Sequence, residues 1–233
     1  MPLNGSKITL KDVDSTVKWL HKLQMGTHAL LIYPDLMTLR RIYAAYAKKQ
    51  LEDGNEIVLI LPYYETTDMV GLALSGNTNT NYSNNFGYSG IDVHKYERDG
   101  SLIIMDSLKG YFPPEKRGSN NNKEGKSEGN LNFISYLDVL LKQAERKGKN
   151  GVTVLSELGS FHHHNQYGTQ KLVEYEQSLP KTYEGNLKGF CLYHQKDFES
   201  RFSRKQQESL SSCHSRHIEL PFKRSEGPRN PIT

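Results

Sequence analysis

Short apolar runs without polar alternation constrain this chain more than any other feature. Runs of this kind occur at residues 29–33, 56–61, 152–155 and 187–193. A strand that is apolar on both sides has to be covered on both faces, which is typical of parallel sheets flanked by helices. Helical patterns lie between these runs, and a helix between two strands makes a crossover. The sequence therefore predicts an α/β fold, a three-layer domain with a mostly parallel sheet.

Apolar residues at helical spacing and capping residues mark the helices. The pattern predicts a leading helix over residues 12–24 and a long helix from Asp35 to Glu52, with Asp35 as its N-cap. Further helices are expected at 67–75, 133–148, 170–179 and 197–211, and short strands at 91–96, 101–105 and 217–220. By domain, we expect a leading helix over 1–25, an α/β domain over 26–220 with polar inserts at 77–90 and 113–130, and a flexible tail over 221–233.

Composition excludes several classes of protein. Charged residues at 24% and hydrophobic residues at 36% describe a folded globular chain rather than a disordered one. The longest apolar runs, such as residues 57–61, are far too short to cross a bilayer, and residues 1–14 lack the apolar core of a signal peptide. We therefore expect a cytoplasmic protein without a membrane partner. Two cysteines argue against a disulfide scaffold, and a net charge of +4 with scattered basic residues does not indicate a nucleic-acid partner.

The junction between the first long apolar strand and its helix is where nucleotide-binding α/β proteins carry a glycine-rich phosphate loop. Here it reads Tyr33-Pro34-Asp35, and the pattern Gly-x4-Gly-Lys-Ser/Thr occurs nowhere in the chain. Pro34 lacks a backbone donor, and Asp35 would repel a phosphate. Asp106 and Glu157 follow apolar strands as the metal-binding acids of ATPases do, but phosphoryl transfer also needs the missing cradle. ATP hydrolysis is not expected, and neither is enzymatic activity.

Residues with an apolar face and a polar tip gather at the predicted strand ends. In open parallel sheets, ligands bind beyond the carboxyl ends of the strands, and such residues suit a small, weakly charged ligand. The tyrosines could instead cap the core, and the sequence leaves both readings open. His28 lies at the opposite, amino end of its strand and is expected to fix the entry turn. The candidate ligand-binding residues are Tyr33, Tyr63, Tyr64, Asp106, Tyr111, Glu157, Tyr193 and His194.

Cysteines and histidines near the last predicted strands are candidates for metal binding or nucleophilic catalysis. Cys191 and His194 share one predicted strand, and Cys213, His214 and His217 surround the next. Without a Cys-x2-Cys pair this is a weak zinc signal. A Cys–His nucleophilic pair is also conceivable, whereas Cys191 alternates within an apolar strand as a buried small hydrophobe would. The sequence therefore assigns no metal, no cofactor and no catalytic residue.

Taken together, the motifs resemble the MEDS domain, the methanogen/methylotroph sensory domain first recognised in a dichloromethane-responsive repressor. The resemblance covers about residues 20 to 220 and rests on the order and spacing of GTHALLIY, LEDGNEIVLILP, GSLIIMDSLKGYF, GVTVLSELG, LVEYEQSL, GFCLYH and a late histidine. It implies a bacterial or archaeal signalling domain with a RecA/KaiC-like fold that lacks the phosphate loop and senses small hydrocarbon derivatives. By motif it points to His28, Tyr33, Tyr111, Glu176, Cys191 and His214.

Three functions stay open at this stage. The first, which we expect, is a non-enzymatic sensory or regulatory domain that binds a small molecule and passes on a conformational change. The second is a degenerate ATPase-like subunit that works through a signalling-protein partner. The third is an enzyme that uses Cys191 with His194 or His214, or a metal at these residues. We expect no effector module after residue 220, and we therefore expect any output to pass through a partner or a homo-oligomer.

Overall fold

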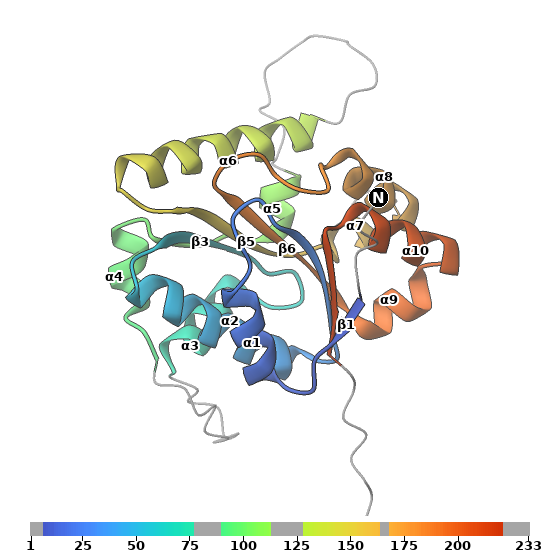
Figure 1. The fold of residues 1–233 in the computed structure, drawn as a ribbon, viewed down its shortest axis with the longest axis horizontal. Helices are drawn as coiled ribbons and strands as arrows, with labels where there is room; N and C mark the ends of the chain where they lie inside the picture. The colour runs from blue at the N-terminus through green and yellow to red at the C-terminus, as the bar shows by residue number, and fades with distance from the viewer. Residues whose placement is uncertain (1–6, 77–89, 113–127, 164–167, 221–233) are drawn as a thin grey trace, which may run out of the picture.

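One parallel sheet forms the centre of the structure, a computed structural model that describes residues 7–76, 90–112, 128–163 and 168–220 (Figure 1). Its strands follow the order β1-β7-β2-β6-β5-β3-β4, and every pairing between them is parallel. The strands are β1 (Lys7–Thr9), β2 (His28–Tyr33), β3 (Glu56–Leu61), β4 (Leu102–Ile104), β5 (Gly151–Glu157), β6 (Leu187–His194) and β7 (Arg216–Glu219).

Helices cover both faces of this sheet (Figure 1). One face carries α1 (Val13–His21), α2 (Leu36–Glu52), α3 (Thr67–Ser75) and α4 (Val93–Arg98). The other carries α5 (Ser107–Tyr111), α6 (Glu128–Arg146), α7 (Ser160–His163), α8 (Gly168–Ser178), α9 (Gln195–Arg201) and α10 (Arg204–Cys213). An apolar core lies between the sheet and each helical layer, and strands β2, β3, β5 and β6 are buried along almost their whole length. The predicted three-layer α/β class is confirmed.

The strand predicted at residues 91–96 is wrong, because most of this segment forms helix α4. Asp92 is the N-cap, and its carboxylate accepts a hydrogen bond from the backbone N–H of Lys95 at 3.0 Å. The sequence predicts a short strand beside the turn at residues 98–100, but this cap stabilises a helix instead. The chain enters the sheet only at β4, after the turn at Gly100.

The single helix predicted over residues 197–211 is two helices, α9 and α10. Phe202 interrupts them in an extended conformation and buries its ring in the core. Ser203 then caps α10 in a capping box with Gln206, in which each side chain bonds to the other residue's backbone. A new cap inside a polar segment is difficult to recognise when the segment has helical composition throughout.

The N-terminal strand, the predicted inserts and the predicted tail are the parts of the chain for which the sequence was least informative. The edge strand β1, which pairs with β7, has no pattern that would predict it from three residues. The predicted inserts and tail lie outside the described residues, except that α6 begins at Glu128, inside the segment assigned to the second insert. Among the helices of the described part, none has both the length and the apolar character that a membrane span requires.

The strand order creates two topological switch points near the centre of the carboxyl edge of the sheet. Strand β2 runs into α2 on one face, whereas its neighbour β6 runs into α9 on the other face. Strand β3 likewise runs into α3, and its neighbour β5 runs into α7 on the opposite face. Ligands of open α/β sheets bind where neighbouring connections diverge in this way. The carboxyl ends of these four strands are therefore the first place to look for a site.

Candidate functional site

A buried carboxylate, Glu157, lies where the carboxyl ends of the central strands meet. Its Oε1 accepts a hydrogen bond from the Tyr33 hydroxyl at 2.5 Å, and its Oε2 accepts from the backbone N–H groups of Tyr63 at 2.7 Å and Tyr64 at 3.1 Å. The Tyr33 ring packs edge-on against His194 with 5.4 Å between ring centroids. Burial raises the pKa of Glu157, although its three hydrogen bonds act in the opposite direction. We call these five residues the strand-end group.

The outer part of the strand-end group is aromatic and half-buried. Tyr63 and Tyr64 pack edge-on with 4.8 Å between ring centroids, and Tyr64 lies 5.8 Å from His194. The Tyr64 hydroxyl donates a hydrogen bond to the carboxylate of Asp197, which also accepts one from Arg201 Nε at 2.9 Å. Burial alone would raise the pKa of Asp197, but these two hydrogen bonds hold it below its usual range. The group thus combines a fixed, buried floor with partly accessible rings.

The side chain of Asp35 caps the first turn of α2. The Asp35 carboxylate accepts hydrogen bonds from the backbone N–H and the hydroxyl of Thr38, at 2.8 and 3.1 Å. The free N–H groups of a helix N-terminus are what would otherwise bind a phosphate. The predicted N-cap is confirmed, and a carboxylate stands where a nucleotide-binding protein would place the anion.

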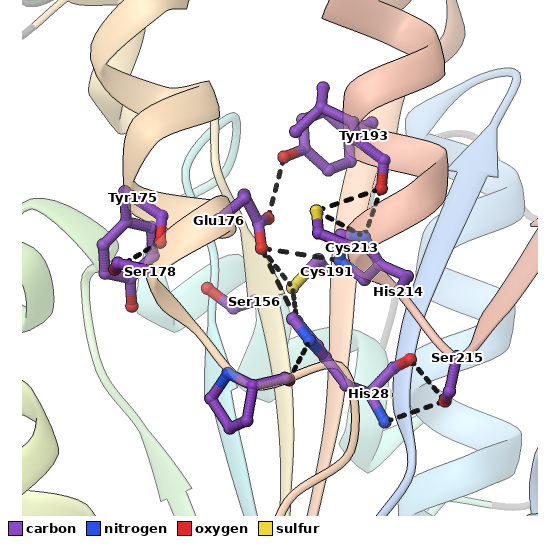
Figure 2. Close-up of polar contacts among 12 residues, drawn as sticks. His28, Ser156, Tyr175, Glu176, Ser178, Cys191, Tyr193, Cys213, His214 and Ser215 are labelled. Atoms are coloured by element: carbon purple, nitrogen blue, oxygen red, sulfur yellow. Dashed lines mark hydrogen bonds and ion pairs between the residues drawn. The ribbon is translucent and has the colours of Figure 1, made fainter. Parts of the chain in front are cut away.

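A second group of polar residues meets on the opposite face of the sheet, beneath α8 (Figure 2). His28 opens β2, Cys191 lies within β6, Glu176 is on α8, and His214 directly follows α10. His28 Nε2 lies 3.3 Å from Cys191 Sγ and 3.5 Å from Glu176 Oε2. Glu176 Oε2 in turn lies 3.4 Å from His214 Nε2 and 3.6 Å from Cys191 Sγ. All four side chains are buried, and we call them the His28 cluster.

Backbone carbonyls determine which nitrogen of each imidazole faces the cluster. His28 Nδ1 lies 3.0 Å from the carbonyl oxygen of Pro180, and His214 Nδ1 lies 2.6 Å from that of Leu210. A carbonyl oxygen only accepts hydrogen bonds, so each Nδ1 carries a proton and donates it. Nε2 of each ring therefore faces the Glu176 carboxylate, and Nε2 of His28 also faces the Cys191 thiol.

Burial controls the charges of the His28 cluster. It lowers the pKa of His214 to about 4, so this imidazole is neutral at neutral pH. Burial and the nearby Glu176 carboxylate raise the pKa of the Cys191 thiol well above its usual range. Burial would also raise the pKa of Glu176, but His214, His28 and the Tyr193 hydroxyl, which donates to Oε1 at 2.8 Å, hold it below its usual range. The Glu176 carboxylate is thus enclosed by two imidazoles, a thiol and a phenol hydroxyl.

The structure distributes the eight candidate ligand-binding residues over several places. The hydroxyl of Tyr193 faces the His28 cluster, and that of Tyr111 lies 2.6 Å from Ser156 Oγ in the same helical layer. Asp106 is the N-cap of α5, where it accepts a hydrogen bond from Lys109. Neighbours on a strand point to opposite faces, which separates Tyr193 from His194. The remaining five form the strand-end group: Tyr33, Tyr63, Tyr64, Glu157 and His194.

Sequence reasoning did not predict the contact between His28 and Cys191. The strand register explains it, because Leu30 pairs with Cys191 and His28 lies two residues before Leu30, on the same face of β2. His217 does not join this group and instead lies 3.0 Å from Glu219. The family resemblance points to all four residues of the cluster, but their contact depends on β2 and β6 being neighbours in this register.

Comparison with known proteins identifies the family of this chain. The family model MEDS, described as "MEthanogen/methylotroph, DcmR Sensory domain", matches residues 27–215, which is well over half of the chain. The matched segment contains the strand-end group and all four residues of the His28 cluster. No curated protein matches the chain. The order of motifs, the parallel α/β fold and this match lead to one conclusion: the chain belongs to the MEDS family of sensory domains.

Proposed function

We propose that this chain is a non-enzymatic sensory or regulatory domain that binds a small, weakly charged organic molecule at the strand-end group. The observation that carries this proposal is the position of half-buried aromatic rings at both switch points of the sheet, above the buried Glu157. Aromatic faces with a few convergent polar groups are typical of small-molecule sites. Membership of a family of sensory domains also supports a sensory function.

The charges around the strand-end group favour a ligand without a phosphate. The carboxylates of Asp35, Glu157 and Asp197 lie at or beside these strand ends. The nearby guanidinium groups already have partners, because Arg40 pairs with Glu65 and Arg201 pairs with Asp197. An anion would therefore lie beside several carboxylates, whereas a neutral molecule could pack on the tyrosine and histidine rings.

The burial of Cys191 supports a non-enzymatic role. Reactive thiols lie in accessible, electropositive surroundings that lower their pKa. Cys191 is 7% exposed, and burial together with the neighbouring Glu176 carboxylate raises its pKa. A Cys–His nucleophile at this place would have neither a thiolate nor access for a substrate.

Transmission of a signal follows from the contacts of Tyr64. Its backbone N–H holds the turn after β3 to Glu157, and its hydroxyl holds the same turn to Asp197 on α9. A molecule that packs between Tyr64 and His194 would favour one arrangement of this turn over another. A ligand shifts such an equilibrium only through a difference in affinity for the two states. The output would then pass to a protein partner or a second copy of the chain.

Heteronuclear NMR with a panel of halomethanes and short-chain alcohols tests this function. We expect saturable shifts of the amide resonances of Tyr63 and Tyr64, and at least a tenfold weaker response in Tyr63→Ala, as the loss of about 1.4 kcal/mol would produce. Tyr136→Ala on α6 is the matched control, because it also removes a half-buried tyrosine but on the other face. Tyr33 is unsuitable for this test, since its loss would also remove a donor from Glu157.

Two results would contradict the proposal. A full response in Tyr63→Ala and in Tyr64→Ala would exclude the strand-end group as the site. Magnesium-dependent ATP hydrolysis that is abolished by substitutions within residues 33–40 would exclude a purely sensory function for the carboxyl edge of the sheet.

A further inference from the structure

We propose that the His28 cluster is a binding site for one divalent transition-metal ion, with a donor set that best suits Zn²⁺. The ligands would be His28 Nε2, His214 Nε2, Cys191 Sγ and Glu176 Oε2 (Figure 2). This assignment is independent of the proposed small-molecule site and departs from the expectation, drawn from the sequence, that no metal is bound.

Four of the six distances between the ligand atoms match the edges of a tetrahedron around zinc. Zinc bonds of about 2.0–2.3 Å to nitrogen, oxygen and sulfur correspond to separations of about 3.3–3.6 Å between neighbouring ligand atoms. The four measured separations are 3.3, 3.4, 3.5 and 3.6 Å, and all the ligand atoms lie within 4.8 Å of one another. Four residues from four separate elements thus converge on one point.

Both imidazoles turn toward the cluster the nitrogen that a metal ion would use. Nδ1 of each ring donates to a backbone carbonyl oxygen, which leaves Nε2 facing Glu176. His214 Nε2 is fully buried and has no hydrogen-bond partner within the described residues. A buried polar atom without a partner is costly, and a bond to a metal ion would remove this cost.

The charge balance also favours a divalent ion. A thiolate and a carboxylate cancel the two positive charges of Zn²⁺, so the loaded site is neutral and compatible with complete burial. The two imidazoles and the thiolate are ligands of intermediate softness, which suit Zn²⁺ better than Mg²⁺ or Ca²⁺. Binding would release the Cys191 proton, as metal sites with cysteine ligands do.

Contacts outside the ligand atoms have the form that metal sites require. Ligating histidines usually donate their second N–H to a carbonyl or carboxylate, and both imidazoles here do so. The free oxygen of Glu176 accepts a hydrogen bond from Tyr193 at 2.8 Å, which orients the carboxylate. The orientation of all three side chains is therefore set before any metal binds.

The location suggests what the metal does. The ligands come from β2, α8, β6 and the residue between α10 and β7, so one ion would join the sheet to its helical layer. Four protein ligands complete a tetrahedron and leave no open position, as in structural zinc sites. His28 and Tyr33 lie at opposite ends of β2, roughly 16 Å apart along the strand at about 3.3 Å per residue. The metal would stabilise the fold at a distance from the strand-end group.

The test uses the full-length protein purified without chelators. Elemental analysis should find about one zinc ion per chain. After removal of the metal, titration with Co²⁺ should produce the visible bands of tetrahedral cobalt and a near-ultraviolet band from thiolate-to-cobalt charge transfer. Adding Zn²⁺ should remove both bands and raise the melting temperature in a concentration-dependent way, whereas Mg²⁺ should not.

Two cysteine variants identify the ligand. Cys191→Ser should lose the charge-transfer band, while Cys213→Ser should keep it, although Cys213 Sγ lies only 3.6 Å from His214 Nδ1. His214→Gln should weaken cobalt binding by at least tenfold, because it removes a ligand rather than an orienting contact. If Cys191→Ser does not fold, the wild-type titration and Cys213→Ser still decide the question.

Three outcomes would overturn the proposal. The first is a folded wild-type protein with reduced thiols that binds neither Zn²⁺ nor Co²⁺. The second is a charge-transfer band that persists in Cys191→Ser. The third is a band that disappears in Cys213→Ser, which would place the thiolate ligand outside the His28 cluster.

Discussion

Replacing Tyr33 by Phe removes one hydroxyl from the buried floor of the strand-end group. This hydroxyl donates to Glu157 Oε1 at 2.5 Å, and both residues are completely buried. The phenyl ring of the variant fills the same space, so packing against His194 is preserved. What changes is the solvation of a carboxylate, which keeps two hydrogen-bond donors, the backbone N–H groups of Tyr63 and Tyr64, instead of three.

The magnitude follows from the charge of the acceptor. A hydrogen bond to a charged group contributes about 1.5–3 kcal/mol, more than a neutral pair does, and a buried acceptor left without its partner retains its desolvation penalty. We therefore expect Tyr33→Phe to lower the free energy of unfolding by about 1.5–3 kcal/mol at neutral pH. In a chain of this length, each kcal/mol lowers the melting temperature by about 2–4 °C.

The effect should depend on pH in a defined direction. Burial raises the pKa of Glu157, so the folded protein holds this proton more tightly than the unfolded chain does. Its ionisation therefore removes stability as the pH rises from the unfolded pKa through the folded pKa. Loss of the Tyr33 donor raises the folded pKa further, so the penalty is greatest at neutral pH and becomes smaller in mild acid.

Urea denaturation followed by circular dichroism, at neutral and mildly acidic pH, measures this effect. Tyr43→Phe is the matched control, because Tyr43 is fully buried in the same core and its hydroxyl has no hydrogen-bond partner among the described residues. We expect this control to be neutral or slightly stabilising. An equal loss in both variants, or a loss in Tyr33→Phe that does not change with pH, would refute the reasoning.

Two further predictions concern buried charges. Lys188→Met should lower the free energy of unfolding by about 3–5 kcal/mol, because it leaves Glu56, 2.9 Å from the ammonium, buried without its cation. The double variant with Glu56→Gln should recover part of this loss, and urea denaturation that shows no recovery would contradict the pairing. Burial and the charge of Lys49 lower the pKa of His21 from its usual 6.5 to about 4, so the unfolded chain binds this proton more tightly and stability falls as the pH drops through that window. His21→Gln should flatten the dependence of unfolding free energy on pH there, and an unchanged slope would exclude this contribution.

Local patterns in the sequence are enough to predict the layers of the fold. Apolar runs without alternation predicted β3 with its observed bounds and placed β2, β5 and β6 within a few residues. Asp35 was recognised as the N-cap of α2 because capping depends on residues three positions apart. The absence of a phosphate loop is also a property of consecutive residues, and so it was read directly. All of these features arise from neighbours in the chain.

Contacts between distant residues could not be predicted from such local patterns. His28 and Cys191 are 163 positions apart, and they touch because β2 and β6 are neighbours in a particular register. The same register turns Tyr193 toward Glu176 and His194 toward Tyr33, although they are adjacent in the sequence. Strand order and register depend on how two helical layers pack on the whole sheet, and no local pattern encodes that packing.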